Sequence, residues 1–399
     1  MTDNFEMKRQ TPPMQPDPNR SQHAANEVFE PAEHGLSMTT NTALVYCEGN
    51  FGALDGKTAN GLVRHSEKYD VRGVIDSEMA GQDSGMVLDG INNTIPIYRD
   101  LADALENMAG TPDYFIFGMA PASGMLSARE RSLLIEAMSY GMDIVNGLHE
   151  FLNEDPVFIA ASAAHGVSII DVRKPRDKKH LRMFSGRIAE VTCPVIAVLG
   201  TDGAIGKRTT STILTNALVA HGIKAIMIGT GQTGLIQGAR YGIAIDAIPA
   251  QFCSGEMEST IVDAFERENP DVIIVEGQGA LSHPAYLTST FILRGSQPDG
   301  VILQHAPGRS HLGDFPETKM PTAKSEINLI ETFSDTKVIG VTINHENMSD
   351  EDVSAAIKSN SSELGIPVTD ALTRSTDFLV DMVVGAFPEL AIKRSVNSH

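Results

Sequence analysis

The most constraining feature of this sequence is an apolar run that opens into a glycine-rich turn and ends at a lysine. The run covers Val195–Leu199, the turn begins at Gly200, and Lys207 precedes a helix-like stretch over Ser211–Ala220. This order gathers backbone N–H groups, a helix N-terminus and an ammonium around one point, which is how α/β proteins hold phosphate. The sequence therefore predicts a phosphate-binding loop.

The loop departs from the usual G-x-x-x-x-G-K-[ST] pattern at two positions. Gly200 stands one place early, and Arg208 occupies the position of the hydroxyl that normally ligates magnesium. We expect a loop with an added cation and no such hydroxyl to bind a phosphate-bearing ligand without hydrolysing it. The residues assigned to this ligand are Gly200, Thr201, Gly203, Gly206, Lys207, Arg208, Thr209 and Asn344.

Composition limits the partners of the chain. Its 399 residues are enough for two domains, and 51 acidic against 31 basic residues give a net charge of −20. A surface of that sign does not attract nucleic acid or an anionic membrane, so small-molecule substrates are expected instead. No apolar stretch reaches the ~20 residues that cross a bilayer. A symmetric homo-oligomer is expected, as for most soluble enzymes of this size.

The cysteines indicate a reducing compartment. Cys47, Cys193 and Cys253 are odd in number, far apart in sequence and in no C-x-x-C arrangement. They predict reduced thiols in a cytoplasmic protein and give no support to an acyl-cysteine intermediate.

The pattern of apolar runs divides the chain into three parts. Residues 1–37 are polar and dotted with proline, which predicts a disordered extension. Over 38–190, short apolar runs alternate with helical stretches, one of them placed near His149–Leu152, as in a Rossmann-like domain. The same alternation over 191–399 surrounds the phosphate loop. The predicted fold class is α/β, with two parallel sheets covered by helices on both faces.

A basic cluster lies close to the predicted domain boundary, between Arg173 and Arg187. In so acidic a chain it is either a solvated linker or an anion site beside the phosphate loop, and the sequence leaves both open.

The apolar runs of the second domain end in turns of glycine and polar residues. These turns cover Gly229–Gly234, Glu276–Ala280, His305–Arg309 and Asn344. Because ligands bind at the carboxyl ends of parallel strands, we expect the site along this one edge of the sheet.

The second domain resembles the dethiobiotin synthetase group of phosphate-loop proteins. Gly200-Thr201-Asp202-x-x-x-Gly206-Lys207 is similar to that group's G-T-D-x-x-x-G-K-T, and Glu276–Gly279 is similar to its E-G-A-G. The resemblance implies that Asn344 reads adenine and that Glu276 helps to hold magnesium. It carries the alternative function, an ATP- and magnesium-dependent ligase or kinase. A non-catalytic nucleotide sensor is a third possibility.

Over most of its length the chain resembles DgcN-type D-glutamate N-acetyltransferases. The resemblance lies in Val45–Asn50, Gly118–Pro121 and Gly141–His149, and it continues through the phosphate loop and the strand-end turns. It implies acetyl transfer from acetyl-CoA to the amine of D-glutamate, in a route of D-amino-acid catabolism. Coenzyme A suits the loop without a metal, since it has no phosphoryl group to transfer.

Acetyl transfer to an amine needs a base, donors for the oxyanion and cations for the carboxylates. Glu276 is the first candidate for the base, and Asp202 and His305 are the others. Arg309 and Arg294 are candidate carboxylate clamps, because a guanidinium binds a carboxylate through two parallel bonds. The remaining predicted substrate contacts are Gln232, Thr233, Gln278 and His283.

Overall fold

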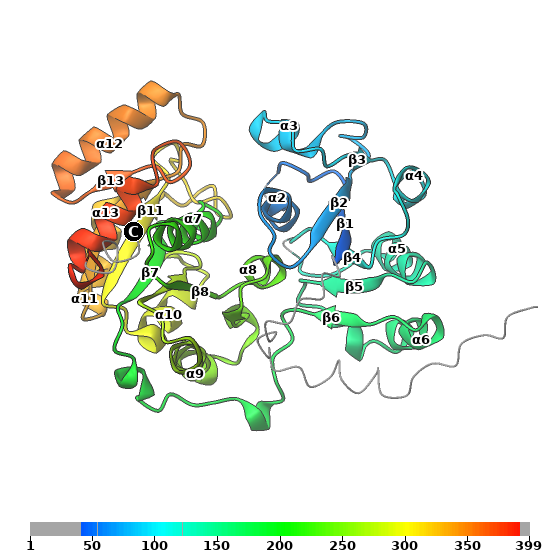
Figure 1. The fold of residues 1–399 in the computed structure, drawn as a ribbon, viewed down its shortest axis with the longest axis horizontal. Coiled ribbons are helices and arrows are strands. Elements are labelled where there is room, and N and C mark those ends of the chain that lie inside the picture. The colour runs from blue at the N-terminus through cyan, green and yellow to red at the C-terminus, as the bar shows by residue number, and fades with distance from the viewer. Residues whose placement is uncertain (1–40, 54, 122, 392–399) are drawn as a thin grey trace, which may run out of the picture.

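The computed structural model describes residues 41–391 except 54 and 122. The predicted extension over 1–37 therefore lies outside the described residues. The described chain forms two parallel sheets with helices packed against them, which lie side by side in Figure 1. In this part of the chain no helix has the length and apolar character needed to cross a membrane.

The first sheet has six parallel strands in the order β3-β2-β1-β4-β5-β6. Its strands are β1 (Thr42–Tyr46), β2 (Asp70–Ile75), β3 (Ile97–Tyr98), β4 (Tyr114–Phe117), β5 (Asp143–Asn146) and β6 (Ile169–Asp171). Its helices are α2 (Lys57–Arg64), α3 (Ser84–Asp89), α4 (Leu101–Asn107), α5 (Ala128–Ser139) and α6 (Pro156–His165). This strand order is that of a Rossmann-like domain.

One predicted helix is wrong. The residues near His149 form a turn, followed by a single 3-10 turn, η1 (Leu152–Glu154). The Asp171 carboxylate accepts the N–H groups of Leu152 and Asn153 at 3.1 and 2.8 Å, which holds this segment in place. The helix begins later, at Pro156 with Asp155 as N-cap, as the sequence Asp-Pro favours.

The second sheet has seven parallel strands in the order β13-β12-β11-β7-β10-β8-β9. Its strands are β7 (Val195–Gly200), β8 (Ala225–Gly229), β9 (Tyr241–Gly242), β10 (Val272–Glu276), β11 (Gly300–His305), β12 (Lys337–Ile343) and β13 (Val368–Thr369). Its helices are α7 (Lys207–Ala220), α8 (Gln232–Gln237), α9 (Ala250–Glu268), α10 (Thr288–Ser296), α11 (Ala323–Phe333), α12 (Asp350–Leu364) and α13 (Asp377–Ala386).

The central strand β7 is buried on both faces. Val195, Ala197 and Leu199 pack into the core on one side of the sheet, and Ile196 and Val198 pack into the core on the other. This explains its continuous apolar sequence, which is typical of parallel sheets. Because β10 and β11 flank β7 and the connections run outward on both sides, the phosphate loop lies where the strand order reverses.

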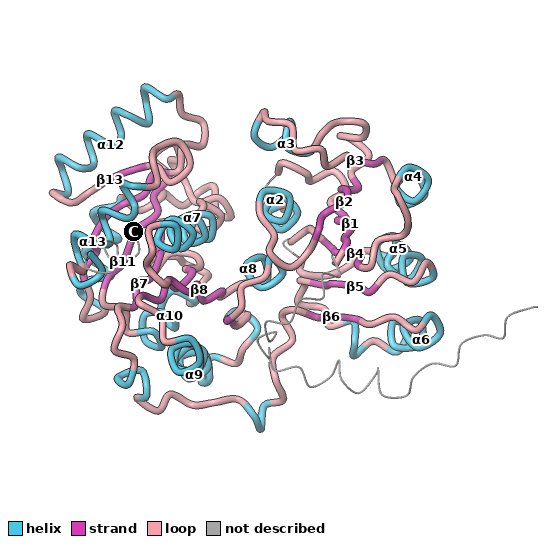
Figure 2. The backbone as a smooth tube through the Cα atoms, viewed as in Figure 1, coloured by secondary structure: helices cyan, strands magenta, loops and turns pink. Residues whose placement is uncertain are grey.

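The connection from β6 to β7 runs along α9 and is drawn mainly as loop in Figure 2. Its basic residues pair with the acidic face of that helix. Arg182 lies 3.0 Å from Asp263, and Arg176 pairs with Glu256. Three arginines of the basic cluster, Arg176, Arg182 and Arg187, therefore tie this connection to α9. Arg173 is an exception, since it turns toward the other domain's Asp246.

Helix α8 forms much of the contact between the domains and lies between the two sheets in Figure 1. The Gln237 side chain donates to the carbonyl groups of Gly61 and His65, both at 2.7 Å. Thr233 Oγ1 lies 2.9 Å from Thr58 Oγ1 of α2. The last three residues of the predicted turn Gly229–Gly234 thus begin a helix that meets the first domain.

Candidate active site

Glycines set the shape of the phosphate loop between β7 and α7. A Cβ at Gly200 would lie 3.0 Å from Lys207 Cδ and 3.1 Å from Gln304 O, so a side chain there would have to displace these neighbours. Gly206 is the N-cap of α7 and has a φ of 99°, in the left-handed region that favours glycine. Within residues 41–391, less the two that are not described, the N–H groups of 204–206 have no acceptor. They are free to bind an anion.

Lys207 supplies the cation of this loop. Its side chain is buried and its Nζ donates to the carbonyl of Asp202. Burial lowers the pKa of Lys207 to about 8, against the opposing charges of Asp202 and Glu276. The ammonium therefore remains mainly charged at neutral pH, as a phosphate ligand requires.

Asp202 and Arg309 fasten the loop to the segment that follows β11. Asp202 Oδ2 accepts from Arg309 Nη1 at 3.0 Å and from Gly313 N at 2.9 Å. The Arg309 Nη atoms also donate to two carbonyl groups of the loop, and its Nε donates to Glu346 at 2.8 Å. Both predicted site residues thus have internal partners. This geometry indicates that they organise the loop.

Glu276 lies at the carboxyl end of β10, next to the first turn of α7. Its Oε2 accepts the N–H of Thr230 at 2.9 Å, and the side chain is buried. Burial raises the pKa of Glu276, while the charges of Arg208 and Lys207 act in the opposite direction. A Cβ at Gly234 would lie 2.7 Å from Glu276 Oε2, so α8 approaches the carboxylate this closely only because that residue is glycine. A carboxylate with a raised pKa is suited to accept a proton.

His283 presents a hydrogen-bond donor toward the loop. Its Nδ1 accepts from the N–H groups of Ala285 and Tyr286, both at 3.2 Å, which assigns the ring proton to Nε2. That Nε2 is buried, has no hydrogen-bond partner among the described residues and lies 3.9 Å from Asp202 Oδ1. Burial lowers the pKa of His283, which keeps the ring neutral. The ring stacks on Tyr286 with centroids 4.3 Å apart.

Two further predicted residues, His305 and Asn344, lie on the β11 and β12 side of the loop, and a third, Thr209, lies on α7. His305 Nδ1 is 3.0 Å from Thr201 Oγ1, and burial lowers the pKa of His305 to about 4, so its ring is a weak base at neutral pH. Asn344 Nδ2 donates to the carbonyl of Ile205 at 2.8 Å and so supports the loop. Thr209 is half-buried in the first turn of α7.

Other predicted residues lie at the domain boundary. Arg208 Nη1 donates to Gln237 of α8, and a Cβ at Gly61 of α2 would lie 2.8 Å from its Nη2. We therefore assign Arg208 to the contact between domains. Thr233 also serves that contact, through Thr58. Gln232 is different, because its Nε2 is buried and has no partner among the described residues.

The last two predicted residues have separate positions. Gln278 Nε2 donates to the carbonyl of Thr230, which places Gln278 beside Glu276. Arg294 is exposed on the last turn of α10, with its guanidinium 5.2 Å from the centroid of the Phe333 ring. Since α10 ends near the amino end of β11, the structure does not bring Arg294 to the other predicted residues.

Several residues at the domain boundary were not predicted from the sequence. Lys57 of α2 interacts electrostatically with Arg173 in its own domain and with Asp314 in the second domain. Asp314 accepts a hydrogen bond from the Tyr286 hydroxyl at 2.6 Å. A signal for Lys57 was present, since Gly56-Lys57-Thr58 repeats the glycine, lysine and hydroxyl that end a usual phosphate loop.

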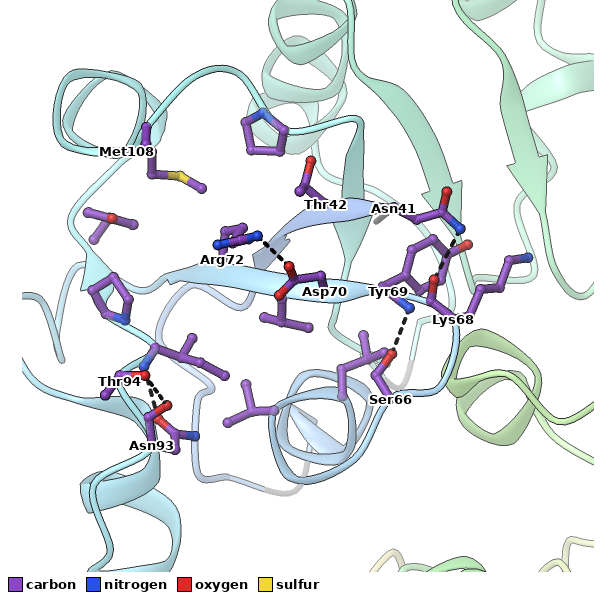
Figure 3. Close-up of a pocket in the computed structure, with 18 of the residues that line it drawn as sticks. Asn41, Thr42, Ser66, Lys68, Tyr69, Asp70, Arg72, Asn93, Thr94 and Met108 are labelled. Carbon is purple, nitrogen blue, oxygen red and sulfur yellow. Dashed lines mark hydrogen bonds and ion pairs between the residues drawn. The ribbon is translucent and has the colours of Figure 1, made fainter. Parts of the chain in front are cut away.

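A pocket of 1240 Å³ opens elsewhere, at the amino ends of β1 and β2 (Figure 3). Its polar groups pair with one another: Asn41 Nδ2 donates to Lys68 O at 3.1 Å, and Arg72 lies 2.5 Å from Asp70. This is the edge opposite the carboxyl ends of the strands, and none of the predicted site residues lines the pocket.

The fold and the loop define a two-domain protein with a Rossmann-like first domain and a P-loop second domain. Residues 182–380 match the family model described as a domain of unknown function, DUF1611_C, a P-loop domain. Residues 77–175 match DUF1611_N, described as a Rossmann-like domain. The chain belongs to the DUF1611 family, and the predicted fold class is confirmed.

Relatives give the family its chemistry. A D-glutamate N-acetyltransferase of Pseudoalteromonas sp is 33% identical over 273 residues, which are 67% of this chain and 80% of the relative. Another, from Tritonibacter scottomollicae, is 30% identical over 283 residues, 69% of this chain and 82% of the relative. A crystal structure of a DUF1611 family protein from Anabaena variabilis has a TM-score of 0.80 and 31% identity, covering 87% of this chain and 100% of that one. The predicted family is confirmed, and the chain is an enzyme of the acyltransferase class.

Proposed function

We propose that this enzyme transfers the acetyl group of acetyl-CoA to the amino group of D-glutamate. The single observation that carries the proposal is the buried carboxylate of Glu276 beside the phosphate loop, in a family whose curated members are D-glutamate N-acetyltransferases. A proton acceptor and an anion-binding loop at one strand edge are what this reaction needs.

The phosphate loop would hold the coenzyme. The free N–H groups of 204–206 and the Lys207 ammonium suit its pyrophosphate. Each charge-assisted hydrogen bond contributes roughly 1.5–3 kcal/mol. No phosphoryl group is transferred in this reaction, so we propose that it runs without a metal.

Glu276 and His283 act in successive steps of the transfer. The substrate ammonium first loses one proton to solvent. Its neutral nitrogen then attacks the thioester carbonyl carbon, which forms the C–N bond, and gives its second proton to Glu276. The Nε2–H of His283 suits the oxyanion that then develops. The C–S bond breaks, the sulfur leaves as a thiolate, and the proton held on Glu276 returns to it. The products are free coenzyme A and N-acetyl-D-glutamate.

The state of the cysteines supports direct acetyl transfer, without an acyl-cysteine intermediate, and a cytoplasmic enzyme. Cys47 and Cys253 are buried and form no disulfide. Burial raises the pKa of Cys253 to about 11 and that of Cys47 further, so neither thiol is an effective nucleophile at neutral pH.

Release of free thiol from acetyl-CoA tests the proposal. The enzyme is assayed in EDTA with D-glutamate, with L-glutamate or with no amine. We expect release with D-glutamate alone. Absence of release with any amine, together with magnesium-dependent ATP hydrolysis, would contradict the proposal in favour of a ligase or kinase.

A further inference from the structure

The first domain brings cations toward the phosphate loop of the second. We propose that Lys57 and Arg173 form a carboxylate subsite that binds the side-chain carboxylate of the amino-acid acceptor. The identity of that acceptor rests on the function proposed above, but the subsite itself rests on the geometry of these residues.

The buried guanidinium of Arg173 has a hydrogen-bond donor with no partner among the described residues. It is 7% exposed, and its Nη1 lies 3.0 Å from Asp246 Oδ2 and in contact with His149 Nε2. Its Nε is buried and has no hydrogen-bond partner among the described residues. Leaving such a donor unpaired is unfavourable, and a ligand carboxylate on the Nε edge would satisfy it.

Lys57 is the second cation, and it is held differently. It is the first residue of α2, its side chain is exposed, and no ion pair or hydrogen bond joins it to another described residue. Its ammonium nevertheless interacts electrostatically with Arg173, Asp246 and Asp314, and it also acts on Lys207. The next residue, Thr58, contacts Thr233 of the second domain at 2.9 Å, so Lys57 lies at the boundary between the two domains.

Contacts connect this subsite to the candidate base. The side chain of Gln232, whose buried Nε2 has no partner in the described part of the chain, packs against Gly147, two residues before His149. Asp246 follows Ile245, whose N–H donates to the Thr230 carbonyl at 3.1 Å, and the Thr230 N–H holds Glu276. Glu276 and Asp246, the partner of Arg173, are therefore both held by the segment around Thr230.

The buried Nε of Arg173, which has no partner among the described residues, favours an acceptor that carries a second carboxylate. Arg173 pairs with Asp246, and two further carboxylates act on Lys57: Asp55 and Asp314, which accepts from the Tyr286 hydroxyl. His149 accepts from Arg173, and burial together with the Arg173 charge lowers the pKa of His149, which disfavours a further positive charge there. We therefore expect a dicarboxylic amino acid to bind more tightly than its uncharged amide.

Calorimetry on the full-length enzyme saturated with coenzyme A tests this. D-glutamate and its amide isostere D-glutamine are titrated into the wild type, Lys57→Met and Arg173→Lys. We expect the wild type to favour D-glutamate by at least about tenfold, and each variant to lose about tenfold of that preference. Lys57 is exposed, so Lys57→Met stays informative even if the buried Arg173→Lys variant fails to fold.

The control is Lys358→Met, since Lys358 is an exposed lysine on α12. It should keep the full preference. Failure of the wild type to bind D-glutamate, or an unchanged preference in Lys57→Met, overturns the subsite. Charge-dependent binding that Lys57→Met abolishes, without thiol release from acetyl-CoA by the wild type, supports the subsite and overturns the proposed reaction instead.

Discussion

The first strand of each domain leads through a glycine-rich turn to a lysine that begins a helix, but the two lysines are held in opposite ways. Lys207 is buried and donates to the carbonyl of Asp202, within a loop that Arg309 ties down. Lys57 follows Gly56 in the same manner, yet it is exposed and has no partner among the described residues. One strand–glycine–lysine–helix unit therefore forms a rigid cradle, whereas the other presents a lysine that has no partner among the described residues.

This difference separates two roles. A preformed loop suits a ligand such as coenzyme A, whose phosphates are the same in every turnover. A cation at the domain boundary suits a charged acceptor that enters and leaves. The chemistry itself is assigned to the second domain, through Glu276 and His283.

The largest expected effect tests that assignment. Glu276→Gln keeps an acceptor for the Thr230 N–H but removes the proton acceptor. We expect kcat to fall about 10²- to 10⁴-fold with the KM for acetyl-CoA little changed. Steady-state thiol release measures both constants, and thermal unfolding checks the fold. An unchanged kcat in a folded variant would remove Glu276 from the mechanism.

The next effect concerns the cradle. Lys207→Met should weaken coenzyme A binding roughly 10- to 100-fold. In the wild type the Lys207 ammonium is charged below its pKa of about 8 and neutral above it, so affinity should decline as the pH rises through 8. Calorimetry from pH 7 to 9 measures this, and the variant, which has no such group, corrects for ionisation of the coenzyme. A parallel decline in both proteins would contradict the role of Lys207.

A glycine next to the base gives a smaller effect. In Gly234→Ala the new Cβ would lie 2.7 Å from Glu276 Oε2 and should displace the carboxylate. We expect about a tenfold loss of kcat. Gly385→Ala in α13 is the matched control, because a Cβ there meets nothing within 4 Å. It should keep kcat and stabilise the helix by up to about 1 kcal/mol. Equal activity of the two variants would show that the carboxylate position is not critical.

The smallest expected effect concerns Cys47 of the first domain, which we expect to take no part in the transfer. Cys47 follows β1 at the same edge as Lys57, but burial raises the pKa of its thiol. Cys47→Ala should therefore keep kcat within about twofold. Loss of turnover in a stable variant would indicate a covalent step in the first domain. It would contradict the assignment of the chemistry to the second domain.

Much of the fold could be predicted, because continuous apolar runs such as Val195–Leu199 encode buried parallel strands. The same reasoning brought Lys207, Glu276 and His283 to one edge. The roles of Arg309 and Arg208 could not be read in this way. Arg309 is committed to Asp202 and Glu346, and Arg208 to Gln237, through contacts that depend on packing between distant segments.

The site residues of the first domain, Arg173 and Lys57, were not predicted for a related reason. Arg173 lies within a basic run whose other arginines pair with α9, so composition alone does not distinguish it. Lys57 gains Asp246 and Asp314 as neighbours only when the two domains meet. The local sequence is enough to predict which residues follow the strands. Which of these side chains pair with one another depends on the tertiary structure.

The central claim is that the two lysines serve different substrates, and one measurement tests it directly. The KM for acetyl-CoA and for D-glutamate is determined in Lys207→Met and in Lys57→Met. We predict that Lys207→Met raises mainly the KM for acetyl-CoA and that Lys57→Met raises mainly the KM for D-glutamate, each about tenfold or more. If both variants change the same constant, or if the pattern is reversed, the two lysines do not have the separate roles assigned to them.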